Sequence, residues 1–286
     1  RPPRGPVKVV GGMTKQNKKR KFDPIRVLNQ RTFRKNKGRN LVAVLAILMT
    51  TLMFTTLFTL AQSMNKNLVE MTFRQTGYDA QASFKDITPE QAEKLTAHPD
   101  VKELGESIVL GLAENDKLAG RQVEIRWAND SYATHSFAAP TTGQMPQAAN
   151  EVALDTIALD RLGIPHELGQ TVTLEWRKDL SDQDSEPLQA EFVLCGFWEG
   201  NESVYASMAW VSREYADQMT GGNPASENGV LGLFMAQVNL YSDSNIEASM
   251  EQILADTGLT GLDYSVNLAY SPEMGATALQ ETLPMY

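Results

Sequence analysis

The sequence predicts an α+β protein in which a transmembrane helix and a stalk precede an outer domain with a split β-α-β lobe and an inserted β-rich lobe. Three observations lead to this prediction. An apolar run without a charged residue, residues 41–64, follows a strongly basic segment. Two β-α-β patterns lie far apart, one from residue 78 and one from residue 234. The segment between them alternates short strand patterns with turns.

The apolar run is long enough to cross a bilayer as a helix. Residues 41–64 would rise roughly 36 Å, and the hydrocarbon core of a bilayer is about 30 Å thick. A helix forms all its backbone hydrogen bonds internally, which is required inside a membrane because no water is available there as a partner. A buried helix of a soluble protein is the alternative, but such helices are shorter and keep a polar face. The run contains five threonines whose hydroxyls are expected to bond to the carbonyl one turn earlier: Thr50, Thr51, Thr55, Thr56 and Thr59.

The distribution of charge predicts the orientation of this span. Residues 1–40 hold 14 Lys or Arg and one acid, which is a net charge of +13. Since the whole chain has a net charge of −9, residues 41–286 have a net charge of −22. Because basic flanks stay in the cytoplasm, we expect the N-terminus inside a bacterial plasma membrane and residues 65–286 outside. A cleaved signal peptide would have a shorter core and a small-residue cleavage site, and neither is seen after Leu60. The basic segment is expected to bind anionic lipid, not nucleic acid.

The segments on either side of the span are predicted from local signals. Residues 1–22 are basic and rich in Pro and Gly, as in disordered segments. Asp23 and Pro24 then mark the start of a short helix on the inner membrane surface, with a solvated linker as the alternative. Residues 1–40 are thus a basic cytoplasmic segment. Beyond the span, residues 65–77 form a helical stalk that ends at Gly77.

The two β-α-β patterns predict a ferredoxin-like lobe. In the first, a capping box at residues 88–91 opens a helix to about Ala97. In the second, Ser242 or Ser244 caps a helix that runs to about Asp256. The predicted strands around these helices are residues 78–84, 101–112, 234–241 and 264–270. The porter-like lobe therefore comprises residues 78–117 and 231–272, the inserted lobe residues 118–230, and residues 273–286 a linker toward a further span.

The inserted lobe is expected to be rich in strands. Asp155 caps a short helix that Gly163 stops, and Ser212 caps a helix to about Met219. The predicted strands are residues 121–127, 171–176 and 191–198, and the predicted loops are residues 134–147, 181–187 and 223–229. The only cysteine, Cys195, lies in an apolar run and is expected to be a buried, inert thiol.

A search for chemistry predicts no catalytic, cofactor-binding or metal-binding residue. The chain has no phosphate-binding loop, dinucleotide fingerprint or nucleophile elbow. The histidines, His98, His135 and His166, are far apart in sequence and are expected to be surface residues. Acids at Asp179, Asp182 and Asp184 are expected to be solvated surface, with a weak cation site as the alternative. Two sequons begin at Asn129 and Asn201, which matter only in a secretory pathway.

Several segments resemble the FtsX/MacB-like permeases of ABC transporters. The first is the basic and apolar stretch RTFRKNKGRNLVAVLAILMTTLMFTTLFTL at residues 31–60. The others lie in the outer domain: NEVALDTIALDRLGI (150–164), LGQTVTLEW (168–176), EFVLCGFWEG (191–200) and AWVSREYADQM (209–219). The resemblance covers nearly all of residues 30–270, and its motifs are structural, not catalytic.

The resemblance implies a non-catalytic membrane subunit that works with a separate cytoplasmic ATPase and a second permease subunit. In this family, dimerisation of the ATPase moves the transmembrane helices, and the stalk passes the motion outward, which is called mechanotransmission. Members export peptides or antibiotics, release lipoproteins or activate cell-wall hydrolases, and they have at least three further spans. We therefore expect this chain to be part of a longer protein. Two alternatives remain from the residues alone: a single-span receptor with a sensing domain, and a membrane-anchored extracellular enzyme.

Overall fold

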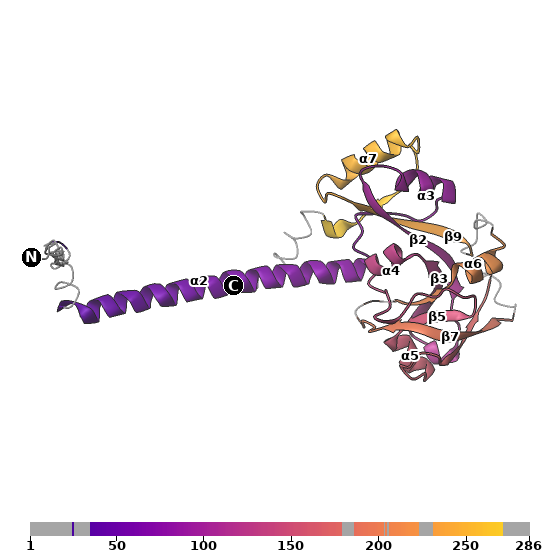
Figure 1. Ribbon diagram of the computed structural model, residues 1–286, viewed down its shortest axis with the longest axis horizontal. Coiled ribbons are helices and arrows are strands. Elements are labelled where there is room, and N and C mark those ends of the chain that lie inside the picture. Colours follow the sequence, from indigo (N-terminus) through magenta and orange to yellow (C-terminus); the bar gives the residue numbers. More distant parts are fainter. Residues whose placement is uncertain are drawn as a thin grey trace, which may run out of the picture. The chain divides into compact units, whose positions relative to one another are not determined.

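The computed structural model (Figure 1) describes residues 25, 35–178, 186–202, 204, 206–222 and 231–270, except for the side chains of Asn65 and Leu68. These residues fall into two units, Arg1–Gln62 and Ser63–Tyr286, which are described separately. Several predicted features lie outside the described residues. They are the disordered segment 1–22, the helix predicted to start at Asp23, the acids 179, 182 and 184, the loop 223–229 and the linker 273–286.

Helix α2, Lys37–Thr76, includes the whole apolar run. Within the described part of the chain it is the one helix long and apolar enough to cross a membrane. Each of the five threonines donates its hydroxyl hydrogen to a carbonyl one turn earlier, as predicted, at 2.7–2.8 Å. The helix ends at Gly77, whose φ of +91° lies in the left-handed region that glycine adopts without strain. The predicted terminator is therefore confirmed.

Four strands and two helices form the predicted ferredoxin-like arrangement. They are β1 (Ala82–Phe84), α3 (Pro89–Thr96), β2 (Val101–Leu112), β9 (Leu233–Leu240), α7 (Ile246–Asp256) and β10 (Ser265–Val266). The strands are antiparallel in the order β10-β1-β9-β2. Each β-α-β pattern thus supplies one central and one outer strand, which is how a split β-α-β sheet is built. The predicted fold class is confirmed.

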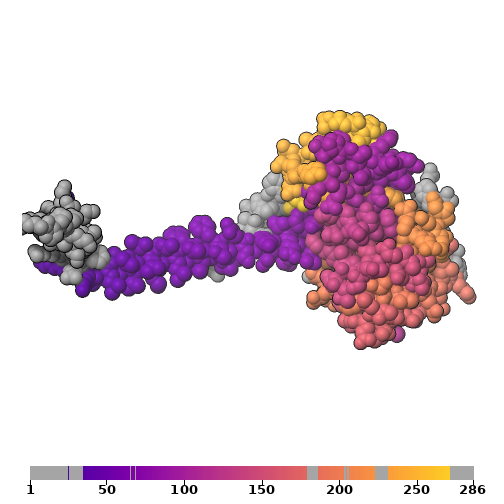
Figure 2. Space-filling model, viewed as in Figure 1, coloured from indigo at the N-terminus to yellow at the C-terminus, as the bar shows by residue number. Residues whose placement is uncertain are grey.

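Both helices of this lobe cover the same face of the sheet. Buried side chains of α3 and α7, among them Leu95, Met250 and Ile253, share one hydrophobic core with Phe84 and Val238 from the strands. The two helices are far apart in sequence, but their surfaces meet in Figure 2, where they are violet and yellow. The capping box that starts α3 is present, because Thr88 and Gln91 exchange both hydrogen bonds.

Three boundaries in this lobe differ from the prediction. β1 starts at Ala82, not at residue 78, and the last strand covers only residues 265–266 before a 3-10 helix, η2 (Leu268–Tyr270). Over residues 78–80 the backbone bonds to the Asn267 side chain, the Tyr270 hydroxyl and the His135 carbonyl instead of a neighbouring strand. The cap of α7 is Asn245, in the left-handed region, and not Ser242 or Ser244. The Ser242 hydroxyl instead accepts a hydrogen bond from the Ser244 amide.

The inserted segment extends the same sheet. It contains η1 (Asp116–Leu118), β3 (Gln122–Ala128), α4 (Asp130–His135), β4 (Thr142–Gly143), β5 (Glu151–Asp155), α5 (Thr156–Leu162), β6 (Thr171–Trp176), β7 (Leu188–Trp198), β8 (Ala206–Val211) and α6 (Arg213–Thr220). The sheet continues from β2 as β3-β8-β5-β7-β4, and β6 also pairs with β7. Asp155 and Ser212 cap their helices, and Gly163 ends α5, as predicted. The lobe boundaries near residues 117 and 231 stay a prediction, because β2 of the ferredoxin-like lobe pairs with β3 of the inserted segment in one continuous sheet.

No helix was predicted at α4, and the predicted loop 134–147 overlaps only its last two residues. Asn129 caps this helix by accepting a hydrogen bond from the Tyr132 amide at 2.9 Å. Its side chain also bonds to the Leu104 carbonyl and the Glu106 amide of β2, both at 3.0 Å. The sequence Asn-Asp-Ser at residues 129–131 was read only as a sequon, although Asn is a favoured cap residue. Figure 1 shows α4 on the other face of β2 from α3.

We predict that Gly105→Ala destabilises the outer domain by about 1–3 kcal/mol, because an added methyl group would overpack the contact between β2 and α4. A Cβ at this position would lie 2.9 Å from the Tyr132 Cα. The measurement is urea unfolding of the full chain in detergent, with tryptophan fluorescence as the signal. Gly38→Ala is the control, since no neighbouring atom lies within 4 Å of its added Cβ. Equal midpoints for Gly105→Ala and wild type would contradict this packing argument.

Candidate functional site

The three histidines lie in different places, and only one has a network around it. His98 Nε2 lies 3.4 Å from Asp256, and His166 Nε2 lies 2.9 Å from Asp160. His135 lies between two carboxylates, described below. Among the described residues, no three His, Cys, Asp or Glu side chains are placed to hold a metal ion.

Cys195 is half-buried, not fully buried as predicted. Its Sγ lies 3.5 Å from the Gln144 carbonyl, to which it donates. Burial, with a smaller contribution from the nearby Glu151 charge, raises the pKa of the thiol to about 12. Because the thiolate is the reactive form, this thiol is unreactive at neutral pH, in agreement with the predicted inert role.

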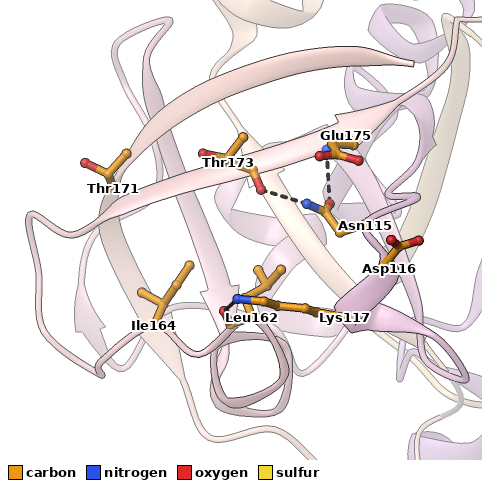
Figure 3. A pocket seen from close by; sticks show the side chains of 8 residues that line it. All are labelled: Asn115, Asp116, Lys117, Leu162, Ile164, Thr171, Thr173 and Glu175. Carbon is orange, nitrogen blue, oxygen red and sulfur yellow. Dashed lines mark hydrogen bonds between the residues drawn. The ribbon is translucent and has the colours of Figure 1, made fainter. Parts of the chain in front are cut away.

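The inserted segment has a hollow of about 390 Å³ (Figure 3). The Asn115 side chain there donates to the Thr173 carbonyl and accepts from the Glu175 amide, both at 3.0 Å. The Lys117 ammonium donates to the Leu162 carbonyl at 3.0 Å. These polar groups hold the outer edge of β6 and the end of α5, so they brace the fold. The hollow is lined by Asn115, Asp116, Lys117, Leu162, Ile164, Thr171, Thr173 and Glu175.

The candidate functional site is the place where the last turn of α2 meets the outer domain. We call it the stalk junction and define it as residues 73–81, 135–137 and 267–270. The Phe73 and Tyr270 rings pack at a centroid distance of 4.9 Å. The Arg74 guanidinium lies 4.8 Å from the centre of the Phe137 ring and also pairs with Glu70 at 3.0 Å. The end of the stalk therefore contacts both the last described helix of the chain and the segment after α4.

Asn267 holds the backbone that leaves the stalk. Its side chain is 1% exposed. Its amide nitrogen donates to the Tyr78 and Ala80 carbonyls at 2.9 and 3.1 Å, and its oxygen accepts from the Ala269 amide at 3.0 Å. A buried carbonyl without a partner would cost free energy, so this side chain replaces the strand that residues 78–80 lack.

Tyr270 adds a second hold on the same backbone. Its hydroxyl donates to the Asp79 carbonyl at 2.6 Å. Burial, together with the charges of Asp243 and Asp79, raises the pKa of the hydroxyl to about 12. The hydroxyl therefore keeps the proton that it donates throughout the neutral range.

His135, at the end of α4, is bonded both to the segment that follows the stalk and to β2. Its Nδ1 lies 2.5 Å from a carboxylate oxygen of Asp79, and its Nε2 lies 3.0 Å from one of Glu103. The hydrogen bond to Asp79, and then the one to Glu103, raise the pKa of His135 against the effect of burial. The hydrogen bond from His135 in turn lowers the pKa of Glu103. We call these three side chains the His135 clasp.

A buried arginine, Arg126 of β3, holds the helix that carries His135. Arg126 is 5% exposed, and its guanidinium donates to Ser107 at 3.1 Å, to Glu124 at 3.0 Å and to the Tyr132 hydroxyl at 2.8 Å. A buried charge is tolerated when it is paired and its hydrogen bonds are made. Arg126 thus ties α4 to β2 and β3, so that α4 presents His135 in a fixed position.

No protein-family model matches the chain, and no curated protein matches it either. Among solved structures, it is similar to the extracellular domain of the noncanonic ABC-type transporter YknZ from Gram-positive bacteria. The identity is 14% and the TM-score 0.43, over 66% of this chain and 99% of that one. It is also similar to the periplasmic region of MacB from Actinobacillus actinomycetemcomitans. There the identity is 11% and the TM-score 0.43, over 72% of this chain and 95% of that one.

At these identities the likeness concerns the fold. Sequence reasoning predicted that the stalk, residues 65–77, transmits motion, but it identified no functional residue in the rest of the junction, because Asp79, His135 and Asn267 meet only in the folded chain.

We predict that Asn267→Ala destabilises the outer domain by about 1–3 kcal/mol, because two buried carbonyls of the stalk junction lose their donor. Leu268→Ala is the matched control. This neighbouring side chain is 67% exposed, so its removal should change the unfolding free energy by less than about 0.5 kcal/mol. Urea unfolding of the two full-length variants measures both values. Equal effects of the two substitutions would show that Asn267 does not hold the junction.

Proposed function

We propose that this chain is a transmembrane permease subunit of an ABC transporter and that a separate cytoplasmic ATPase moves its outer domain. The observation that carries this proposal is helix α2, which includes the apolar run and ends in the contacts of the stalk junction. Residues 40–76 contain no Gly or Pro. Because those residues are the usual causes of kinks, α2 is suited to transmit displacement along its length.

The stalk junction would divide this motion between two parts of the outer domain. Phe73 contacts Tyr270, which leads through η2 to the ferredoxin-like sheet. Arg74 contacts Phe137, which follows α4 and leads to the inserted segment. A displacement of the last turn of α2 therefore reaches both parts through packed side chains.

The remaining roles follow from the family resemblance. The subunit is not an enzyme, and the energy comes from ATP hydrolysis by its partner. The other expected partners are the lipid bilayer and a second permease subunit, in a bacterial plasma membrane. The output is export of a peptide, antibiotic or lipoprotein, or mechanical control of an outer partner. A single-span receptor would share α2 but would not respond to ATP in the cytoplasm.

The orientation is tested by labelling single cysteines in intact cells with a membrane-impermeant maleimide. In a Cys195→Ser background, Leu168→Cys should be labelled, because Leu168 is 49% exposed on the outer domain. Asn17→Cys should be labelled only after the cells are opened, since basic flanks stay in the cytoplasm. The reverse pattern would place the outer domain in the cytoplasm and refute the proposal.

The role of α2 is tested by two insertions of equal length after Lys66. A flexible Gly-Ser insertion of about two helical turns should abolish ATP-dependent movement of the outer domain, because it breaks the stiff connection. An Ala-rich insertion of the same length should preserve the movement, since the helix continues. Spin-label distances within the outer domain, measured with the partner ATPase and ATP, are the readout. Both insertions must leave membrane insertion and ATPase binding intact, and ATP-dependent movement that survives the Gly-Ser insertion would contradict the lever role of α2.

A further inference from the structure

The geometry of the His135 clasp requires a charged imidazole. Both ring nitrogens face carboxylate oxygens, Nδ1 toward Asp79 and Nε2 toward Glu103. A neutral imidazole has one N–H and one acceptor nitrogen, so it would turn a lone pair toward one carboxylate. Only the imidazolium can donate to both. Deprotonation of His135 therefore removes one hydrogen bond and leaves a lone pair facing a negative charge.

The layer around the clasp is polar, which makes it easy to loosen. By register, Asn239 and Gln237 of β9 lie opposite Glu103 and Gly105 of β2, on the sheet face that α4 covers. Gln237 donates to Ser136 at 3.1 Å, directly after α4. Gln237 Oε1 and Asn239 Nδ2 are buried, and neither has a hydrogen-bond partner among the described residues. Because buried polar groups gain from meeting water, separation of α4 from this part of the sheet costs less than separation of an apolar contact.

We propose that the His135 clasp is a pH-responsive latch that fixes α4 and the segment after the stalk to the sheet when His135 is protonated and loosens the stalk junction when it is not. The consequence for transport rests on the function proposed above, because a looser junction would transmit less of the motion of α2. The latch itself is a property of the outer domain and does not depend on the ATPase.

Several charged or titratable groups lie near the clasp, and His135 is the one among them that changes its protonation near neutral pH. The Lys102 ammonium lies 4.0 Å from the Glu103 carboxylate on the same strand. Asp79 carries the carbonyl to which Tyr270 donates, and Asp243 accepts from Gln81 at 2.6 Å nearby. Arg74 lies over Phe137 at the end of α2. Of these residues only His135 has an ordinary pKa between 5 and 8.

The two pKa shifts define the pH range in which the latch is closed. The pKa of His135 is raised from 6.5, so its contribution is complete below pH 6.5 and is lost as the pH rises through the higher value of the folded state. The pKa of Glu103 is lowered from 4.5, so its contribution is present above pH 4.5 and is lost as the pH falls through the lower value. The latch is therefore strongest between about pH 4.5 and 6.5 and weakens at alkaline pH.

The first test is a histidine NMR titration of the full chain in lipid nanodiscs. The chain has only three histidines, and His135→Gln identifies the signal of His135. We expect this signal to titrate above pH 6.5, with both ring nitrogens protonated at pH 6. Glu103→Gln should move the titration back toward 6.5. A titration at or below 6.5, or a single neutral tautomer at pH 6, would overturn the latch.

The second test is hydrogen exchange of residues 77–84 and 130–138 in the same samples at pH 6 and pH 8, corrected for the intrinsic rate. In wild type, exchange should be faster at pH 8 by roughly three- to tenfold, the range expected when one hydrogen bond of the clasp is lost. His135→Gln and Glu103→Gln should remove this difference, whereas His166→Gln, which changes a histidine with a single carboxylate partner, should keep it. Equal protection at both pH values in wild type would refute the latch. Neither test involves the ATPase, so the latch and the proposed function fail separately.

Discussion

The stalk junction depends on one constraint, the hydrogen bonding of a buried backbone that has no neighbouring strand. Residues 78–80 lie between a helix and the sheet, and Ala80 is fully buried. The Asn267 side chain, the Tyr270 hydroxyl and the His135 carbonyl supply the missing partners. These groups come from the end of α4 and from the segment after β10, so the end of the stalk is tied to two distant parts of the chain.

The two faces of the ferredoxin-like sheet are covered in different ways. One face is apolar and is covered by α3 and α7, which share one core with it. The other face carries Gln237 and Asn239 and is covered by α4, which is held by hydrogen bonds of Asn129, Arg126 and His135. Apolar packing therefore fixes one layer, while directed hydrogen bonds and ion pairs fix the other. Directed contacts depend on protonation and geometry, which suits the latch proposed for this layer.

Much of the secondary structure could be predicted because its signals are local. The capping box at Thr88, the cap at Asp155 and the terminators Gly77 and Gly163 need only neighbouring residues, and all were confirmed. The predictions failed where a tertiary contact replaced a local one. Residues 78–80 alternate like a strand, but Asn267 occupies the place of their ladder. Asn245 occupies the N-cap position of α7 in a left-handed conformation and without a side-chain cap hydrogen bond, so the local cap preference of Ser242 and Ser244 did not decide where the helix starts.

The sequence by itself determined the long apolar helix, the charge asymmetry across it and the split β-α-β pattern, because periodicity and net charge are properties of the chain before it folds. Only the tertiary structure decided that Asp79, Glu103 and His135 form one cluster and that Asn267 closes the junction. These residues are separated by up to nearly two hundred positions, and each looks like an ordinary polar residue in its own segment. Their role arises from the register of β9 against β2 and from the seating of α4, which no local pattern encodes.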